Sequence, residues 1–147
     1  MKVQRVADPS EFEATLASTL SAAAGRVFVV VFGTEEAATG ESWCVIFVPC
    51  IHTHACLTED AIGRCPDCVT SDPLIRKAVL TVKDSVLVEV PAGDRPTYRD
   101  PKNFYRNHEQ LKVTAVPTLY EFGKDGKVIK KLVESEITSA SLAAFVQ

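Results

Sequence analysis

The sequence lacks any long hydrophobic run. Its longest apolar stretches are Val27–Phe32 and Val45–Pro49, far shorter than the ~20 residues that a membrane-spanning helix needs. The first residues also lack the apolar core of a secretory signal, so we expect a cytosolic (cytoplasmic) protein with no membrane segment. Runs of lysine and arginine are missing and the net charge is only −3, which argues against nucleic-acid and membrane partners.

The chain is too short for two well-packed domains. At 147 residues it predicts a single domain, residues 1–147, which we expect to be monomeric. Its 46% apolar and 24% charged residues are typical of a globular domain. It holds five cysteines, and without export these indicate a reducing compartment. There a C-x-x-C motif is more often catalytic or metal-binding than structural.

Hydrophobic periodicity predicts an α/β domain. A helix lies between two buried strands, which favours a right-handed crossover between parallel strands. Asp125-Gly126 predicts a hairpin that adds antiparallel strands to the same sheet. We therefore expect a central mixed sheet flanked by helices. The predicted elements are a short strand at 3–6, a helix from Ser10, strand 27–32, helix 69–80, strand 86–90, a polar loop with a short helix from Asp100, strands 118–122 and 128–133, and a helix from Thr138 or Ser139.

The motif Cys65-Pro66-Asp67-Cys68 precedes the second predicted helix. Beside a β-α-β pattern it is typical of a thioredoxin-like redox site. Unpaired N–H groups and the helix dipole would stabilise a Cys65 thiolate as the nucleophile, and Cys68 would resolve the mixed disulfide. Pro66 suits the first helical position. We expect the charge of Asp67 to raise the thiol pKa or to assist proton transfer.

Val116-Pro117 is the second candidate element of the site. In a thioredoxin-like fold, the proline before this strand is cis and faces the dithiol. The preceding residue then offers backbone groups to a bound substrate. From the sequence alone, Pro117 could equally be an ordinary proline at the start of a strand.

Matching stretches run through most of the chain, and they resemble the thioredoxin domain-containing protein 17 family, whose site reads W-C-P-D-C. The resemblance implies a thioredoxin-like fold, with Trp43 beside the dithiol, and a cytosolic disulfide reductase without a bound cofactor. Electrons would come from NADPH through thioredoxin reductase, and substrates would be small disulfides and selected proteins. Tyr98 stands where the family is expected to have tryptophan. The matching residues are 32–33, 40–44, 66–69, 73–76, 100–103, 111–119 and 131–136.

Residues 45–64 interrupt the family motif. Removing 21 residues, either Val45 to Cys65 or Cys44 to Arg64, restores Trp-Cys-Pro-Asp-Cys without a gap. Our hypothesis is a retained intron or gene-model error, and we expect the segment to form a loop. Either Cys65 or Cys44 could then occupy the nucleophile position.

A metal site is the alternative interpretation. Cys50, His52, His54 and Cys56, with the C-x-x-C cysteines, offer enough zinc ligands, although their spacing is uncommon. The chain would then be a zinc-binding or redox-inactive adaptor with a thioredoxin-like fold. We favour the redox interpretation and predict no metal. Of the remaining residues, His108 is expected to be a solvated helix residue, and Phe104 and Tyr105 to be packing residues.

Overall fold

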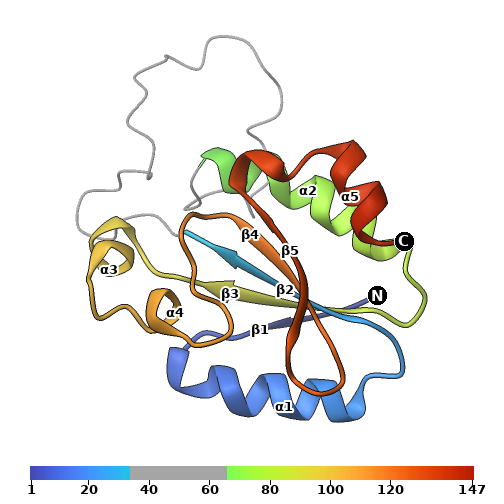
Figure 1. Cartoon of the computed structure of the whole chain (residues 1–147), viewed down its shortest axis with the longest axis horizontal. Coiled ribbons are helices and arrows are strands. Elements are labelled where there is room, and N and C mark those ends of the chain that lie inside the picture. Colours follow the sequence, from blue (N-terminus) through green and yellow to red (C-terminus); the bar gives the residue numbers. More distant parts are fainter. Residues whose placement is uncertain (34–65) are drawn as a thin grey trace, which may run out of the picture.

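The computed structural model describes residues 1–33 and 66–147, apart from the side chains of residues 66–69 and 95. In this part of the chain a five-stranded sheet has the order β1-β3-β2-β4-β5 (Figure 1). β3 is parallel to both β1 and β2, whereas β4 is antiparallel to β2 and β5. The predicted mixed sheet is confirmed. The strands are β1 Lys2–Arg5, β2 Val27–Phe32, β3 Val86–Pro91, β4 Thr118–Phe122 and β5 Val128–Val133.

Helices cover both faces of the sheet. α1 (Phe12–Ala22) lies on one face, and α2 (Pro66–Leu80) and α5 (Ser139–Phe145) lie on the other (Figure 1). α3 (Arg95–Arg99) and α4 (Phe104–Asn107) belong to the connection between β3 and β4. None of the helices described combines the length and the apolar character needed to cross a membrane.

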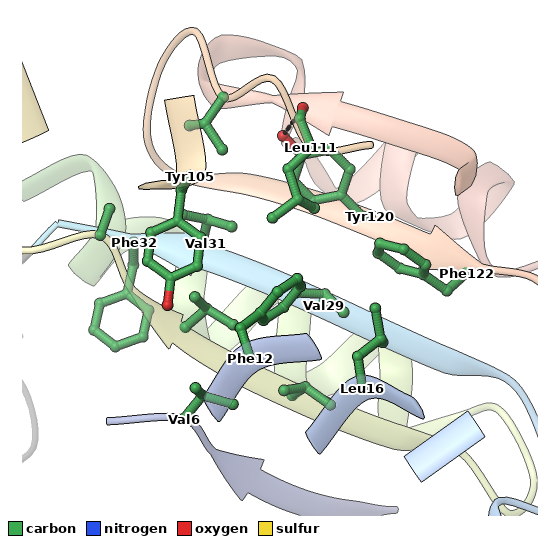
Figure 2. Packing of buried hydrophobic residues seen from close by; sticks show 14 of the residues in the cluster. Val6, Phe12, Leu16, Val29, Val31, Phe32, Tyr105, Leu111, Tyr120 and Phe122 are labelled. Atoms are coloured by element: carbon green, nitrogen blue, oxygen red, sulfur yellow. Dashed lines mark hydrogen bonds between the residues drawn. The ribbon is translucent and has the colours of Figure 1, made fainter. Parts of the chain in front are cut away.

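The core on the α1 side joins the helix to the β3–β4 connection. Phe12 is fully buried and its ring meets the ring of Tyr105 edge-on, with centroids 5.7 Å apart. Figure 2 shows Phe12 and Leu16 directed toward the sheet beside Val29. The connection is therefore anchored in the core through Tyr105, which confirms its predicted packing role.

The core on the opposite side explains the continuous apolar sequence of β2. Phe28 and Val30 of β2 pack with Ile75 and Val79 of α2, while alternate residues of β2 face α1. Every residue of β2 is buried. A strand covered on both faces needs an unbroken apolar run, which is why the sequence pattern identified it.

Two contacts fix the direction of α2. The hydroxyl of Ser85, just before β3, donates to the carbonyl of Val79, 2.9 Å away. Further along β3, Glu89 pairs with Arg76, which lies earlier in the helix. α2 therefore runs antiparallel to β3, as expected for a crossover from β2 to β3. Its first turn lies at the end of the sheet where β2 and β3 finish.

The connection between β3 and β4 differs from the expected loop with one short helix from Asp100. Two helices form there, and each begins with a side-chain cap. A side-chain oxygen of Asp94 accepts the N–H of Thr97 at 3.0 Å, and that of Asn103 accepts the N–H of Tyr105 at 3.0 Å. Helices of five and four residues are too short to show a hydrophobic period.

The prediction for His108 is wrong. His108 follows α4 in an extended conformation, and its side chain is only 8% exposed. Its ring pairs with Glu13 of α1 and lies 5.3 Å from the ring of Phe12. Glu13 is 95 residues away in the sequence, so no local pattern could reveal the pair.

Candidate active site

The first turn of α2 carries the C-x-x-C motif. α2 begins at Pro66, so this proline occupies the predicted first helical position, with Asp67 and Cys68 in the same turn. The free N–H groups at such a helix start favour a nearby anion. Cys65, Cys44 and Trp43 lie outside the described residues, as does the predicted insertion, residues 45–64. Their roles therefore stay predictions.

The peptide bond between Val116 and Pro117 is cis, as predicted for a thioredoxin-like fold. Both residues are buried, and Val116 is 6% exposed. Two hydrogen bonds hold this segment: the N–H of Glu134 donates to the carbonyl of Pro117 at 2.7 Å, and the side-chain hydroxyl of Thr118 donates to the carbonyl of Ala115 at 2.6 Å. The side chain of Val116 belongs to the core on the α1 side of the sheet.

The topology brings the cis peptide and the start of α2 to the same end of the sheet. Thr118, the first residue of β4, is in register with Val31 near the end of β2. Because β4 is antiparallel to β2, it starts where β2 finishes. α2 also starts at that end (Figure 1). Pro66 and Val116, about fifty positions apart in the sequence, thus lie at the same end of the sheet.

A charge cluster lies beside the first turns of α2. Arg76 pairs with Asp72 at 2.9 Å and also with Glu89 of β3, which is 5% exposed. Burial alone would lower the pKa of Arg76, but its hydrogen bonds and the charges of Asp72 and Glu89 outweigh burial and raise it. This cluster was not predicted from the sequence. Two features of the sequence could have indicated it: Asp72 and Arg76 are four residues apart in a predicted helix, and Glu89 is an acid inside an apolar strand.

A groove of about 460 Å³ lies between η1 (Pro9–Glu11) and the α3–α4 connection. It is lined by residues that follow β1 and β3, such as Ala7 and Ala92, and by Thr97 and Phe104. β1 and β3 are parallel, so the groove opens at the sheet end where α2 starts. Nearby, Tyr98 lies 5.6 Å from the guanidinium of Arg106, and burial raises the pKa of its hydroxyl. The residue that replaces the expected tryptophan is therefore packed within this connection.

The predicted zinc ligands Cys50, His52, His54 and Cys56 also lie outside the described residues. Among the side chains that the structure describes, no three of histidine, cysteine, aspartate or glutamate gather as metal ligands.

Comparison with known proteins gives a consistent answer. Residues 51–146 match the family described as thioredoxin domain-containing protein 17-like, thioredoxin domain. Thioredoxin domain-containing protein 17 of mouse is 42% identical over 92 residues, which cover 60% of this chain and 70% of that protein. The human protein is 40% identical over 88 residues, covering 58% and 67%. Thioredoxin-like protein Clot of Arabidopsis thaliana is 31% identical over 132 residues, covering 87% and 81%.

A mixed sheet with a cis proline before β4 and a C-x-x-C motif at the start of α2 defines a thioredoxin-like protein. The matched residues include that motif and every element from α2 to α5. The chain belongs to the thioredoxin domain-containing protein 17-like family. Membership supports a redox function of the thioredoxin type.

Proposed function

We propose that this chain is a thiol–disulfide oxidoreductase that reduces disulfides with Cys65 and Cys68. The observation that carries the proposal is the position of the motif. Pro66 opens α2, and the cis peptide before Pro117 lies at the same end of the sheet. A cysteine thiol at a helix start loses its proton readily, and the resulting thiolate can attack a disulfide.

The reaction proceeds in two exchanges. The Cys65 thiolate attacks one sulfur of the substrate disulfide, forms a mixed disulfide and releases the other sulfur as a thiolate. Cys68 then loses its proton to solvent, attacks the Cys65 sulfur and releases the second substrate thiolate. Two electrons pass to the substrate, and the protein is left with a Cys65–Cys68 disulfide.

The neighbouring residues contact the substrate and adjust the shape and charge of the turn that holds the thiols. Pro66 stiffens the turn, Asp67 adjusts the charge next to the thiols, and Trp43 forms part of the substrate surface. Val116 offers backbone groups beside Pro117 to the substrate chain. Cys44 is a second candidate for the nucleophile, because it directly follows Trp43, as the first cysteine of the family motif does. Cys65 is separated from Trp43 by Cys44 and residues 45–64.

Turnover requires that the disulfide be reduced again. We propose that thioredoxin reductase does so with electrons from NADPH, in the cytosol, and that no cofactor is bound by the chain itself. Substrates are small disulfides and selected proteins.

Insulin or cystine reduction coupled to NADPH oxidation by thioredoxin reductase tests the proposal. We expect turnover in the wild type, none in Cys65→Ser, and an isolable mixed disulfide with substrate in Cys68→Ser. Cys44→Ser is the matched control and should retain turnover. Stoichiometric zinc binding without turnover would instead support the adaptor function. Loss of activity in Cys44→Ser, with activity kept in Cys65→Ser, would identify Cys44 as the nucleophile.

A further inference from the structure

His108 caps the turn that follows α4. Its Nδ1 atom accepts the backbone N–H groups of Gln110 at 3.1 Å and Leu111 at 3.2 Å, and its Nε2 atom pairs with the carboxylate of Glu13 on α1. At the start of α4, the Oδ1 atom of Asn103 likewise accepts the N–H groups two and three positions further on. The ring of His108 therefore does here what an amide side chain does earlier in the same connection.

These contacts fix the orientation and the charge state of the ring. Turning the ring over would place carbon atoms, which do not make these bonds, opposite Glu13 and the two N–H groups. Because Nδ1 accepts two N–H groups, it carries no proton. Nε2 then bears the proton of the neutral ring and donates to Glu13. The geometry thus fits a neutral histidine that is protonated on Nε2.

Protonation of His108 changes the bonds on one side of the ring only. Nε2 bears a proton in the neutral and in the charged form, so the bond to Glu13 persists in both. Nδ1 becomes a donor that faces two N–H donors, so both bonds to the backbone are lost. The side chain is only 8% exposed, which leaves water little access to replace them. Histidine ordinarily changes its charge between pH 5 and 8.

The groups packed around the ring are mostly uncharged. The rings of Phe12 on α1 and Phe104 on α4 meet it at centroid distances of 5.3 and 5.5 Å. Tyr105 of α4 stays neutral in this pH range, because burial raises its pKa to about 12. The charged residue of α1 is Glu13 itself. The remaining charged side chains belong to α4 and to the turn, and they are exposed: Arg106, Glu109 and Lys112.

Three comparable caps in the described part of the chain keep their acceptors in mild acid. Asp8 accepts the N–H of Ser10, and Asp94 accepts that of Thr97. Hydrogen bonds from these same residues lower the pKa of both carboxyls. The third cap, Asn103, has no charge to gain. Of these four caps, the one formed by His108 is therefore the one that mild acid removes.

The capped turn leads into the segment that ends at the cis peptide. Leu111 is 1% exposed, and its carbonyl accepts the hydroxyl of Tyr120 on β4 at 2.9 Å. The N–H of Val113 donates to the carbonyl of Tyr105 at 3.2 Å, three residues before Val116. The turn therefore sets where the chain enters the core on its way to the cis peptide.

We propose that His108 is a positioning residue for this segment, which holds the backbone of Gln110 and Leu111 when neutral and releases it when protonated. Its meaning for substrate binding rests on the proposed function, in which Val116 offers backbone groups to the substrate. Mild acid then weakens substrate binding by loosening the segment that presents those groups.

NMR of the reduced protein tests the cap without any substrate. Long-range ¹H–¹⁵N spectra show which ring nitrogen bears the proton, and the His108 signals are those absent from His108→Asn. At about pH 8, above the usual range of histidine protonation, we expect that proton on Nε2. At about pH 5.5, hydrogen-exchange protection of the Gln110 and Leu111 amides should be roughly 2- to 10-fold lower, the factor that one ordinary hydrogen bond is worth. Protection is measured relative to an unstructured peptide at the same pH.

The chain supplies matched controls for this loss of protection. The amides of Tyr105 and Arg106, which Asn103 caps, should keep their protection at both pH values. His108→Asn places a neutral oxygen acceptor at the same position, so protection of Gln110 should no longer depend on pH. His108→Ala removes the acceptor and should show low protection throughout. If His108→Ala does not fold, the comparison of His108→Asn with the wild type still decides.

Insulin reduction gives a readout that a merely structural role would not move. At about pH 8, where histidine is ordinarily neutral, wild type and His108→Asn should have the same KM. At about pH 6 the KM of the wild type should exceed that of His108→Asn roughly 2- to 10-fold, with equal kcat. The dithiol is the same in both proteins, so its own titration cancels in the ratio.

A proton on Nδ1 at about pH 8 would overturn the inference, since that pH lies above the usual histidine range. Equal loss of protection in the wild type and His108→Asn would do so as well. An unchanged KM ratio in an active protein would refute the positioning role. The expected NMR results in a protein without reductase activity would refute the proposed function and leave the cap assigned.

Discussion

Two tyrosines of the core differ in whether their hydroxyl has a partner. The Tyr120 hydroxyl donates to the carbonyl of Leu111 at 2.9 Å, a bond drawn in Figure 2. The Tyr105 hydroxyl is buried without a hydrogen-bond partner among the described residues. Both side chains are about 1% exposed, so burial is matched and the hydrogen bond is the main difference between the two hydroxyls.

Removing the two hydroxyls should therefore have different effects. We expect Tyr105→Phe to be neutral or to stabilise the fold by up to about 1 kcal/mol, because an unpaired buried hydroxyl costs free energy. Tyr120→Phe should cost about 1–2 kcal/mol, because it leaves the Leu111 carbonyl unpaired. Urea unfolding of both variants measures this. Equal losses in the two variants would contradict the hydrogen-bond assignment.

Alkaline pH gives a second prediction for the same residue. Burial, together with the charge of Asp8, raises the pKa of Tyr105 to about 12, against about 10 in an unfolded chain. Between these values the unfolded state binds fewer protons than the folded state, so the free energy of unfolding falls as the pH rises. The slope should reach about 1.4 kcal/mol per pH unit for each buried tyrosine.

Tyr105→Phe should make the free energy of unfolding fall less steeply at alkaline pH. Below about pH 10, where tyrosine ordinarily begins to ionise, the pH dependence of that free energy should not change. Urea unfolding at a series of pH values between neutral and strongly alkaline measures it. A slope identical to that of the wild type would mean that Tyr105 ionises equally in both states, contrary to its burial.

Among the elements, the end of α5 is bonded to an arginine that also neutralises a buried acid of the sheet. Arg26, just before β2, bonds the buried carboxylate of Glu121 at 2.6 and 2.8 Å. The same guanidinium donates to the carbonyls of Phe145 and Val146 at the end of α5. The bond to Glu121, helped by its charge and opposed by burial, raises the pKa of Arg26. Arg26 therefore neutralises Glu121 and provides hydrogen-bond donors for two carbonyls at the end of α5.

Arg26→Met should cost roughly 2–4 kcal/mol, because Glu121 then stays buried without its partner. Amide hydrogen exchange in α5 should accelerate more than exchange in α1. Lys130→Met is the control, because Lys130 also donates to the Phe145 carbonyl, at 3.3 Å, but leaves no buried acid unpaired. Similar losses in both variants would contradict this role of Glu121.

The sequence predicted the elements that carry strong local signals. β2, β4 and β5 have the predicted bounds. β2 is a continuous apolar run, and β4 and β5 lie on either side of the Asp125-Gly126 turn, in which Gly126 adopts the positive φ of 77°. α2 starts three residues earlier than the predicted helix at Val69. α3 and α4 could not be identified, since their caps act over only two or three residues.

For the whole molecule, the sequence located the motif and the cis proline but not the charges around them. Cys65-Pro66-Asp67-Cys68 and Val116-Pro117 are recognisable because each is a compact motif of fixed spacing. The pairing of Arg76 with Glu89 depends on how α2 lies across β3, and that of His108 with Glu13 joins distant segments. Such contacts arise from the fold and leave little trace in local sequence.

The fold brings the start of α2, the cis peptide before Pro117 and the bridged carboxylates of Asp72 and Glu89 to one end of the sheet. This arrangement supports a redox dithiol at that end. It also makes the identity of the cysteine that pairs with Cys68 the central question, since Cys65 and Cys44 both fit the family motif.

Disulfide mapping of the oxidised protein answers that question most directly. Trypsin cleaves after Arg64 and Arg76, so Cys65 and Cys68 stay in one peptide, while Cys44 lies in another. After mild oxidation with glutathione disulfide, we predict that the 65–76 peptide is lighter by two hydrogen atoms and regains them on reduction. A cross-link between Cys68 and the peptide of Cys44, or no disulfide at Cys68, would contradict the account.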